Sequence, residues 1–253
     1  MTAKITVTDL TMAYGSLVVM RDLNFEIQDK DIFVIMGGSG CGKSTLLRHL
    51  IGLQEPSKGG ILYDGKDFTT TDPAERGSFI KRFGVMYQSG ALWSSLTLGE
   101  NISMPIEESA EIPAKTVRDL VSYKLSLVGL SGYEDFYPAQ ISGGMKKRAG
   151  IARAMALDPD ILFLDEPGAG LDPLSSRRLD DLILRLRDSQ GSTIVIVTHE
   201  LASIFNIATQ ALFLDTATHT QGALGNPADL RDHSDNPAVR LFLNRGELPN
   251  SPP

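Results

Sequence analysis

Residues 37–45 read Gly37-Gly38-Ser39-Gly40-Cys41-Gly42-Lys43-Ser44-Thr45, a glycine-rich segment that indicates the fold of the chain. The pattern is a glycine, four variable residues, and then glycine, lysine and serine. Glycines let the backbone curl tightly, so that its N–H groups point inward at phosphate oxygens. In such a loop the lysine reaches the β- and γ-phosphates of a nucleotide, and the hydroxyl ligates Mg²⁺. The sequence therefore predicts a phosphate-binding loop in which Lys43 and Ser44 take these two roles.

The residues on either side of the loop favour the same interpretation. The apolar run over Asp31–Met36 is typical of a strand that is buried on both faces, and Lys43–Leu53 reads as a helix. The simpler alternative, a glycine turn with an exposed lysine, requires neither element. Cys41 occupies a variable position of the loop, where we expect a passive small residue, with a reactive thiol as the alternative.

Composition narrows the class of protein. The chain has 253 residues and a net charge of −7, which argues against a nucleic-acid partner. Cys41 is the only cysteine, so an internal disulfide is impossible. No apolar run approaches the roughly 18–20 residues that span a bilayer, and the N-terminus lacks the apolar core of a secretory signal. We therefore expect a cytoplasmic protein whose membrane role, if it has one, needs a separate partner.

Strand and helix patterns alternate along much of the chain. Apolar and polar residues alternate around Ile5/Val7 and Phe25/Ile27, which predicts short strands with one buried face. Further strands are predicted at Phe83–Tyr87, Ile161–Leu164 and Ile194–Val197, and an amphipathic helix at Leu174–Arg187. Strands that alternate with helices indicate an α/β fold with a mainly parallel sheet.

The segment from about residue 89 to 157 has a different character. Apolar residues recur there near helical spacing, and Pro113 stands at a plausible helix start. These apolar residues are Leu120, Val121, Leu125 and Val128. We therefore predict a mostly helical insertion. The last residues, 246–253, end in Pro-Asn-Ser-Pro-Pro, and we expect a disordered tail there.

Polar residues follow three of the predicted strands. Asp165 and Glu166 end the Ile161–Leu164 strand, and in a P-loop enzyme the first acid orders the Mg²⁺ shell while the second lies near the γ-phosphate. Glu166 is then the candidate general base that activates water. His199 follows the Ile194–Val197 strand, where it is placed to bond the γ-phosphate. Gln88 follows Phe83–Tyr87 as a candidate ligand of the metal or of the water.

A second segment resembles an anion-binding helix start. Ser142 is a good N-cap residue, Gly143 and Gly144 expose backbone N–H groups, and the helix is predicted to run to about Leu157. Taken alone, the segment is equally consistent with an ordinary capped helix.

The order of these motifs resembles the nucleotide-binding subunits of ABC transporters over residues 4–245. Gly37–Thr45 is similar to the Walker A loop, Gln88 to the Q-loop, and Ser142-Gly143-Gly144 to the family signature. The remaining matches are Tyr14 with the aromatic residue that stacks on adenine, Asp165 and Glu166 with Walker B and its catalytic glutamate, Leu171-Asp172 with the D-loop, and His199 with the switch histidine.

The resemblance implies a P-loop NTPase core, an N-terminal antiparallel β-subdomain and an inserted α-helical subdomain, all in a single ATPase domain over residues 1–245. It implies a head-to-tail homodimer that hydrolyses ATP with Mg²⁺, each nucleotide lying between Walker A of one chain and the signature of the other. Met145 and Ile141 depart from the usual signature residues, but the serine hydroxyl and the glycine N–H groups remain. Gly168-Ala169-Gly170 also departs from the common sequence before the D-loop.

Three further segments resemble the ATPases of Mla/Mce-type systems, which move phospholipid between the membranes of Gram-negative bacteria. They are Gly90-Ala91-Leu92, Ser142–Lys146 and Asn236–Asn244. This resemblance implies a permease of the MlaE type, a periplasmic Mce-domain lipid carrier, and a position on the inner face of the cell membrane. No motif indicates the small regulatory domain that Mla ATPases bind. Trp93 is either exposed at the permease surface or buried in the helical insertion.

Two alternatives remain for the function. One is the ATPase of an importer of amino acids or other small solutes. The other, of a different class, is an ABC ATPase that regulates a membrane protein without transport. The ribosomal and chromosome-organising relatives carry two cassettes or a long coiled coil, and this sequence has neither.

Overall fold

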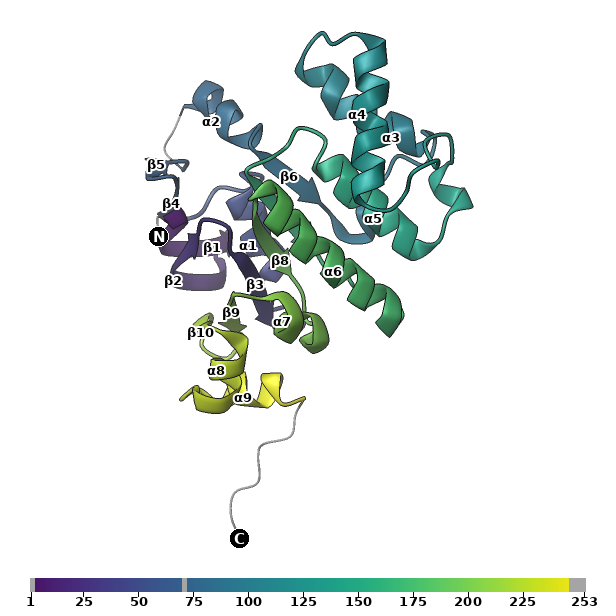
Figure 1. The fold of residues 1–253 in the computed structure, drawn as a ribbon. Coiled ribbons are helices and arrows are strands. Elements are labelled where there is room, and N and C mark those ends of the chain that lie inside the picture. The colour runs from purple at the N-terminus through teal and green to yellow at the C-terminus, as the bar shows by residue number, and fades with distance from the viewer. Residues whose placement is uncertain (1–2, 70–71, 246–253) are drawn as a thin grey trace. The chain divides into compact units, whose positions relative to one another are not determined.

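The computed structural model describes residues 3–69 and 72–245, which belong to two compact units (Figure 1). One unit combines the chain up to Ile80 with the chain from Thr193 onward, and the other is the continuous segment Lys81–Ser192. The first unit therefore carries both ends of the colour range in Figure 1. The tail expected at residues 246–253 lies outside the described residues.

An antiparallel sheet with the order β2-β1-β4-β5 belongs to the first unit. Its strands are β1 (Ala3–Tyr14), β2 (Leu17–Gln28), β4 (Lys58–Tyr63) and β5 (Lys66–Asp67). The predicted alternation is present, because Ile5, Val7, Phe25 and Ile27 are buried while the residues between them are more exposed. Tyr14 pairs with Leu17, so Tyr14 stands at the closed end of the β1–β2 hairpin.

The second set of strands in this unit has the order β10-β9-β3-β8. The strands are β3 (Ile32–Gly37), β8 (Thr193–Val197), β9 (Gln210–Asp215) and β10 (Thr220–Gly225). β3 runs parallel to β8 and to β9, and all its residues are buried, as the apolar run predicted. Because the carboxyl ends of parallel strands meet at one sheet edge, the loops after β3 and β8 leave the sheet at the same edge.

Helix α1 (Lys43–Leu50) begins at the predicted residue but ends before Leu53. Gly52 is left-handed, with φ of 77°, and the N–H of Leu53 donates to the carbonyl of Arg48 at 2.9 Å, which closes the last turn. The other helices of the unit are α2 (Pro73–Ile80), α7 (Leu201–Ile207), α8 (Pro227–His233) and α9 (Pro237–Leu243).

The second unit consists of two parallel strands and a group of helices. Strand β6 (Phe83–Met86) pairs with β7 (Ile161–Asp165), with Met86 opposite Leu164. The helical elements are the 3₁₀ turns η1 (Gln88–Gly90) and η2 (Pro138–Gln140) and the helices α3 (Leu98–Ser109), α4 (Ala114–Leu127), α5 (Gly143–Ala154) and α6 (Pro173–Gln190). Figure 1 shows α3, α4 and α5 packed beside one another in the segment expected to be helical.

Helix α5 is shorter than the sequence predicted. It ends at Ala154 instead of about Leu157, because the chain turns there: the N–H of Asp158 donates to the carbonyl of Met155, and Asp158 is left-handed with φ of 49°.

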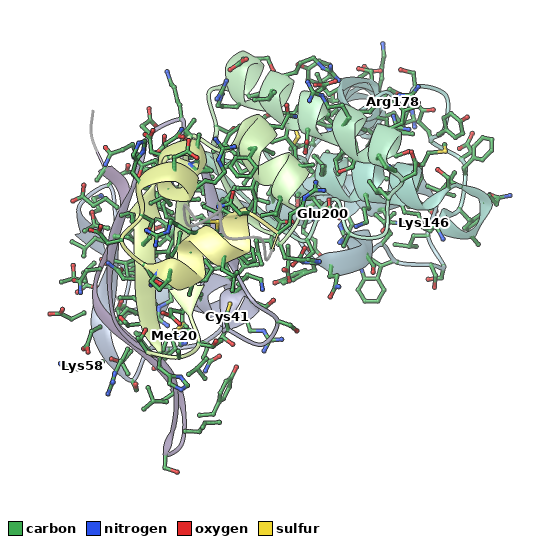
Figure 2. The ribbon with its side chains drawn as sticks, turned by 90° about the horizontal axis from the view of Figure 1, so that it is seen from below. Met20, Cys41, Lys58, Lys146, Arg178 and Glu200 are labelled. Atoms are coloured by element: carbon green, nitrogen blue, oxygen red, sulfur yellow. The ribbon has the colours of Figure 1, made fainter. Side chains whose placement is uncertain are left out.

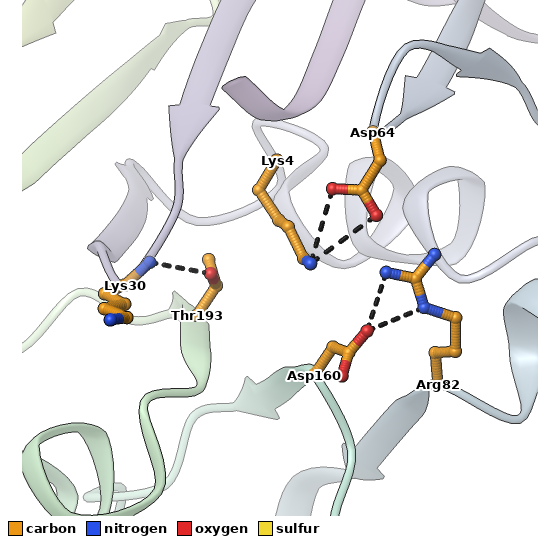
Figure 3. Close-up of polar contacts among 6 residues, drawn as sticks. All are labelled: Lys4, Lys30, Asp64, Arg82, Asp160 and Thr193. Carbon is orange, nitrogen blue, oxygen red and sulfur yellow. Dashed lines mark hydrogen bonds and ion pairs between the residues drawn. The ribbon is translucent and has the colours of Figure 1, made fainter. Parts of the chain in front are cut away.

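Polar contacts tie distant segments together within each unit (Figure 3). In the first unit Lys4 pairs with Asp64 at 3.3 Å, and the backbone N–H of Lys30 donates to Oγ1 of Thr193 at 2.9 Å. The second contact joins the turn before β3 to the start of β8. In the other unit Arg82 pairs with Asp160 at 2.6 Å, beside the first residues of β6 and β7.

Candidate nucleotide site

The predicted phosphate loop lies between β3 and α1 in the first unit. Gly42 caps α1 with φ of 95°, and a β-carbon there would lie 2.9 Å from Cγ1 of Val19 on β2. Only glycine fits both constraints, so the loop presses closely against β2. Figure 2 shows Met20 of β2 near Cys41 of the loop. The first N–H groups of α1 follow directly, which is the geometry that binds phosphate.

Lys43 folds back over this loop. Its Nζ donates to the carbonyl oxygens of Gly37 at 3.0 Å and Gly38 at 2.9 Å. A phosphate group is ionised, so its oxygens are stronger acceptors than these neutral carbonyls. Cys41 is 1% exposed, and burial raises the pKa of its thiol. The structure thus supports the passive residue expected at Cys41 and disfavours a reactive thiolate.

Tyr14 lies beside the same loop with its ring half exposed, at 48%. Its hydroxyl donates to Oε1 of Gln54 at 3.0 Å. Hydrogen bonding lowers the pKa of the phenol, and the largest contribution comes from Thr45. Thr45 belongs to the first turn of α1, so the hydroxyl end of Tyr14 is held near the phosphate loop. The arrangement suits the predicted stacking of an adenine on the exposed ring.

His199 follows β8 and is exposed. Val197 pairs with Ile35 of β3, and the N–H of Thr198 donates to the carbonyl of Ile35 at 3.3 Å. Therefore His199 lies at the edge of the sheet from which the phosphate loop emerges. Tyr14, the phosphate loop and His199 all belong to the first unit.

The other candidate residues gather in the second unit. Gln88 follows β6, and Asp165 is the last residue of the adjacent parallel strand β7, so both lie at the same edge of this strand pair. Ser89 and Ala91 are left-handed, with φ of 66° and 46°. Such conformations cost non-glycine residues about 1–3 kcal/mol each and gather at functional sites.

Glu166 is 9% exposed, and its backbone is left-handed with φ of 48°. Its carbonyl oxygen accepts hydrogen bonds from Nζ of Lys147 at 3.0 Å and from the N–H of Ala169 at 3.2 Å. Sequence reasoning gave no role to Lys147. The signal for it is a lysine on the side of α5 that also carries the buried residues Gly150 and Ile151, three and four positions further on.

The signature segment forms the exposed N-terminus of α5. Oγ of Ser142 accepts from the N–H of Met145 at 3.3 Å, which confirms the predicted N-cap. Ser142 and Gly143 are exposed, so the helix start is open to a ligand. Asp172 caps α6 in a similar way, because its carboxylate accepts from the N–H groups of Leu174 and Ser175. Hydrogen bonding lowers the pKa of Asp172, and the largest contribution comes from Ser175.

The predicted magnesium ligands are Ser44 in the first unit and Gln88 and Asp165 in the second. Within residues 3–69 and 72–245, no group of three or more His, Cys, Asp or Glu side chains gathers to hold a metal. In a nucleotide site Mg²⁺ takes one or two carboxylates and completes its shell with phosphate oxygens and water. Ser44, Gln88 and Asp165 offer the oxygen donors that Mg²⁺ prefers.

A cavity of about 490 Å³ opens beside the Gln88 loop. Its lining includes Tyr87, Trp93, Met104, Pro105, Glu108, Arg153 and Leu157. Trp93 is 58% exposed, so the alternative in which this ring is buried among the helices is wrong. The fully buried amide of Asn101 holds the backbone of Trp93 at both its N–H, 2.8 Å, and its carbonyl, 3.1 Å. The ring is therefore presented on a fixed segment.

Comparison with known proteins places these motifs in one family. The profile described as ABC transporter matches residues 20–169. The probable ribonucleotide transport ATP-binding protein mkl of Mycobacterium leprae is 40% identical over 240 residues, which cover 95% of this chain and 68% of that protein. The intermembrane phospholipid transport system ATP-binding protein MlaF of Haemophilus influenzae is 39% identical over 210 residues, 83% and 80% of the two chains. MlaF of Escherichia coli K12 is 35% identical over 93% of this chain and 86% of that protein.

Solved structures agree with this assignment. The structure of cbiO1 from Clostridium perfringens, described as part of an ABC transporter complex, superposes with a TM-score of 0.84 at 26% identity and covers 97% of both chains. The dimeric ATP-binding cassette MJ0796 bound to ADP and Pi gives a TM-score of 0.79 at 25% identity, covering 88% of this chain and 98% of that chain. No helix in the described part of this chain is long and apolar enough to cross a membrane. The chain therefore belongs to the ABC transporter family, as one of its ATP-hydrolysing, nucleotide-binding subunits.

Proposed function

We propose that this subunit energises phospholipid transport between bacterial membranes, bound to an integral-membrane permease of the MlaE type. The observation that carries the proposal is the similarity to two MlaF proteins over most of the chain. The ribonucleotide named for mkl is the specific observation that favours a second candidate, the ATPase of a small-solute transporter.

Residues 1–245 act in this proposal as a single ATPase domain that works as a homodimer. Tyr14 stacks on adenine, Gly37–Thr45 binds the phosphates, and the partner subunit's Ser142, Gly143 and Gly144 close the site. The open start of α5 supports this arrangement, because exposed helix N–H groups bind anions.

The remaining residues complete the chemistry. Ser44, Gln88 and Asp165 hold Mg²⁺, which neutralises charge on the phosphates. Glu166 activates the attacking water, His199 bonds the γ-phosphate, and Asp172 joins the nucleotide interface. Their places after β6, β7 and β8 support these roles, since ligands bind at the carboxyl ends of parallel strands.

The cavity beside Trp93 is the proposed docking place of a short permease helix. Its lining is largely apolar, and Glu108 and Arg153 add one charge of each sign. An exposed tryptophan is a frequent anchor of protein interfaces. Trp93→Ala should weaken co-purification with the permease, whereas Tyr123→Ala, which removes a 51% exposed ring of α4 outside the cavity, should not. If the permease co-purified equally well with both variants, this docking place would be excluded.

The subunit is accordingly placed on the cytoplasmic face of the inner membrane, and a periplasmic Mce-domain protein carries lipid for the same system. The decisive experiment reconstitutes the chain with the membrane proteins encoded beside it and follows fluorescent phospholipid between two vesicle populations. ATP should drive lipid movement with the wild-type chain, and Glu166→Gln should stop it. ATP-driven uptake of a ribonucleotide without lipid movement would favour the small-solute alternative instead.

A further inference from the structure

Lys147 is a buried cation directly behind the catalytic edge of the second unit. It lies one turn into α5 and is 7% exposed. A buried ammonium group loses its hydration and is tolerated only where polar groups of the protein replace the water. One such group is the carbonyl oxygen of Glu166, 3.0 Å from Nζ. The lysine therefore joins α5 to the residue proposed as the general base.

The accepting carbonyl belongs to a turn that sets the direction of the Glu166 side chain. Glu166 has φ of 48°, a conformation that a residue with a side chain keeps only when its surroundings enforce it. Two donors fix the next peptide group: Nζ of Lys147 and the N–H of Ala169. Loss of the charged donor would allow the turn to relax, and the carboxylate would move with the backbone.

The first turn of α5 also touches the far end of the same loop. The open side of Gly144 faces Cδ2 of Leu171, 3.6 Å from the place of a β-carbon. The N–H of Leu171 donates to the carbonyl of Gly168 at 3.0 Å, so the loop is internally braced. Helix α5 consequently contacts both ends of the Glu166–Leu171 loop: Lys147 bonds to Glu166 at one end, and Gly144, which follows Gly143, faces Leu171 at the other.

We propose that Lys147 is a positioning residue for Glu166: it holds the general base through its carbonyl and ties it to the helix that carries the signature. The inference rests on the role proposed for Glu166. In the proposed dimer the start of α5 binds the ATP of the opposite site. A shift of α5 on this binding is transmitted by Lys147 to Glu166 of the same chain. In this role Lys147 acts on the reaction through Glu166 and not by contact with the substrate.

The test compares two substitutions at Lys147 in the full-length protein. Lys147→Met keeps the unbranched side chain up to the ε position and removes the donor, so the kcat for ATP should fall by about tenfold to a hundredfold, as expected for a misplaced catalytic group. The KM for ATP should stay within about twofold, because the phosphate contacts remain. Lys147→Arg keeps a donor and should recover a large part of kcat.

Lys124→Met is the matched control. Lys124 is a second buried lysine of the same unit, 1% exposed, on α4, and it pairs with Asp158 at 2.5 Å. Its replacement removes the same group from a similarly buried place away from Glu166. We expect a lower melting temperature with an unchanged kcat below that temperature, which separates positioning from loss of stability.

A double variant completes the design. If Lys147 acts through Glu166, Lys147→Met should lower the residual rate of Glu166→Gln by less than about twofold, because groups that act as a unit are not additive. A wild-type kcat in Lys147→Met, or an equal loss in both backgrounds, would overturn the inference. Wild-type hydrolysis by Glu166→Gln alone would instead overturn the assignment of the general base.

Discussion

Gly150 of α5 lies against Gly90 of the Gln88 loop, with no room for a side chain between them. A β-carbon at Gly150 would lie 2.8 Å from Cα and 3.0 Å from the carbonyl oxygen of Gly90. That carbonyl also accepts a hydrogen bond from Nη2 of Arg153 at 3.2 Å. Helix α5 thus holds the loop after β6 in its left-handed conformation, so the loop and the signature helix are expected to move together.

Gly150→Ala should destabilise the protein by about 1–3 kcal/mol, the usual cost of inserting a methyl group into a tightly packed contact. Chemical denaturation gives the free energy of unfolding. Gly77→Ala is the control, because Gly77 lies in α2 with no atom within 4 Å of a β-carbon. That variant should be neutral or more stable by up to about 1 kcal/mol, since alanine favours helix. If Gly150→Ala were as stable as Gly77→Ala, the close contact would be wrong.

Glu166→Gln should abolish most ATP hydrolysis and leave nucleotide binding intact, because the amide keeps the shape of the side chain and cannot take up a proton. Size-exclusion chromatography with ATP should show more dimer than for the wild-type chain, since ATP remains unhydrolysed at the interface. Hydrolysis at the wild-type rate would remove Glu166 from the mechanism.

Lys43→Ala should eliminate tight ATP binding, because the loop loses the cation that pairs with the β- and γ-phosphates. A fluorescent ATP analogue measures the Kd. Lys58→Ala is the control: Lys58 is an exposed residue of β4 in the same unit, so its loss changes the net charge equally and should leave the Kd unchanged. Equal affinity of both variants would show that the phosphates bind elsewhere.

His49 should make the protein less stable in acid. Burial lowers its pKa below the ordinary 6.5, although a bond to the carbonyl of Gln54 at 2.8 Å opposes the shift. Nε2 is buried and has no hydrogen-bond partner among the described residues. As the pH falls below about 6.5, the unfolded chain binds a proton that folded His49 resists, so the free energy of unfolding decreases.

His49→Asn should flatten this decline, because the amide preserves a donor for the Gln54 carbonyl and does not titrate. Melting temperatures at about pH 7.5 and about pH 5.5 give the comparison, because these two values lie on either side of the ordinary pKa of histidine, which applies to the unfolded chain. His233→Asn, at the exposed end of α8, is the control and should keep the wild-type dependence on pH. If the melting temperature of His49→Asn fell between the two pH values by as much as that of the wild-type chain, the role of His49 would be wrong.

Much of the fold could be predicted because its signals are local. Three predicted features depend only on residues that are close together in the sequence, and the structure contains all of them. They are the alternation at Ile5 and Val7, the apolar run into Gly37 and the N-cap at Ser142. The helix ends were less accurate. The ends of α1 and α5 depend on left-handed residues, Gly52 and Asp158, that a periodic apolar pattern does not reveal.

The contacts that support the site could not be predicted in the same way. Lys147 reads as one more cation in Lys146-Lys147-Arg148, and only the packing of α5 shows that its amino group is buried against Glu166. Asn101 likewise reads as a polar residue in a helix, although its amide fixes Trp93. Both contacts depend on how the chain turns between the two partners, 19 residues apart in one pair and eight in the other, and no periodic pattern in the sequence records that turn.

The discontinuous first unit has a consequence for synthesis on the ribosome. Strand β3, which leads into the phosphate loop, is made early, but its two partners are β8 and β9, with Ile32 opposite Ile194 and Phe33 opposite Gln210. The whole Lys81–Ser192 unit emerges in between. A nascent chain therefore carries its nucleotide-binding loop on an unpaired apolar strand until β8 and β9 have emerged, and an unpaired apolar strand is open to aggregation during that interval.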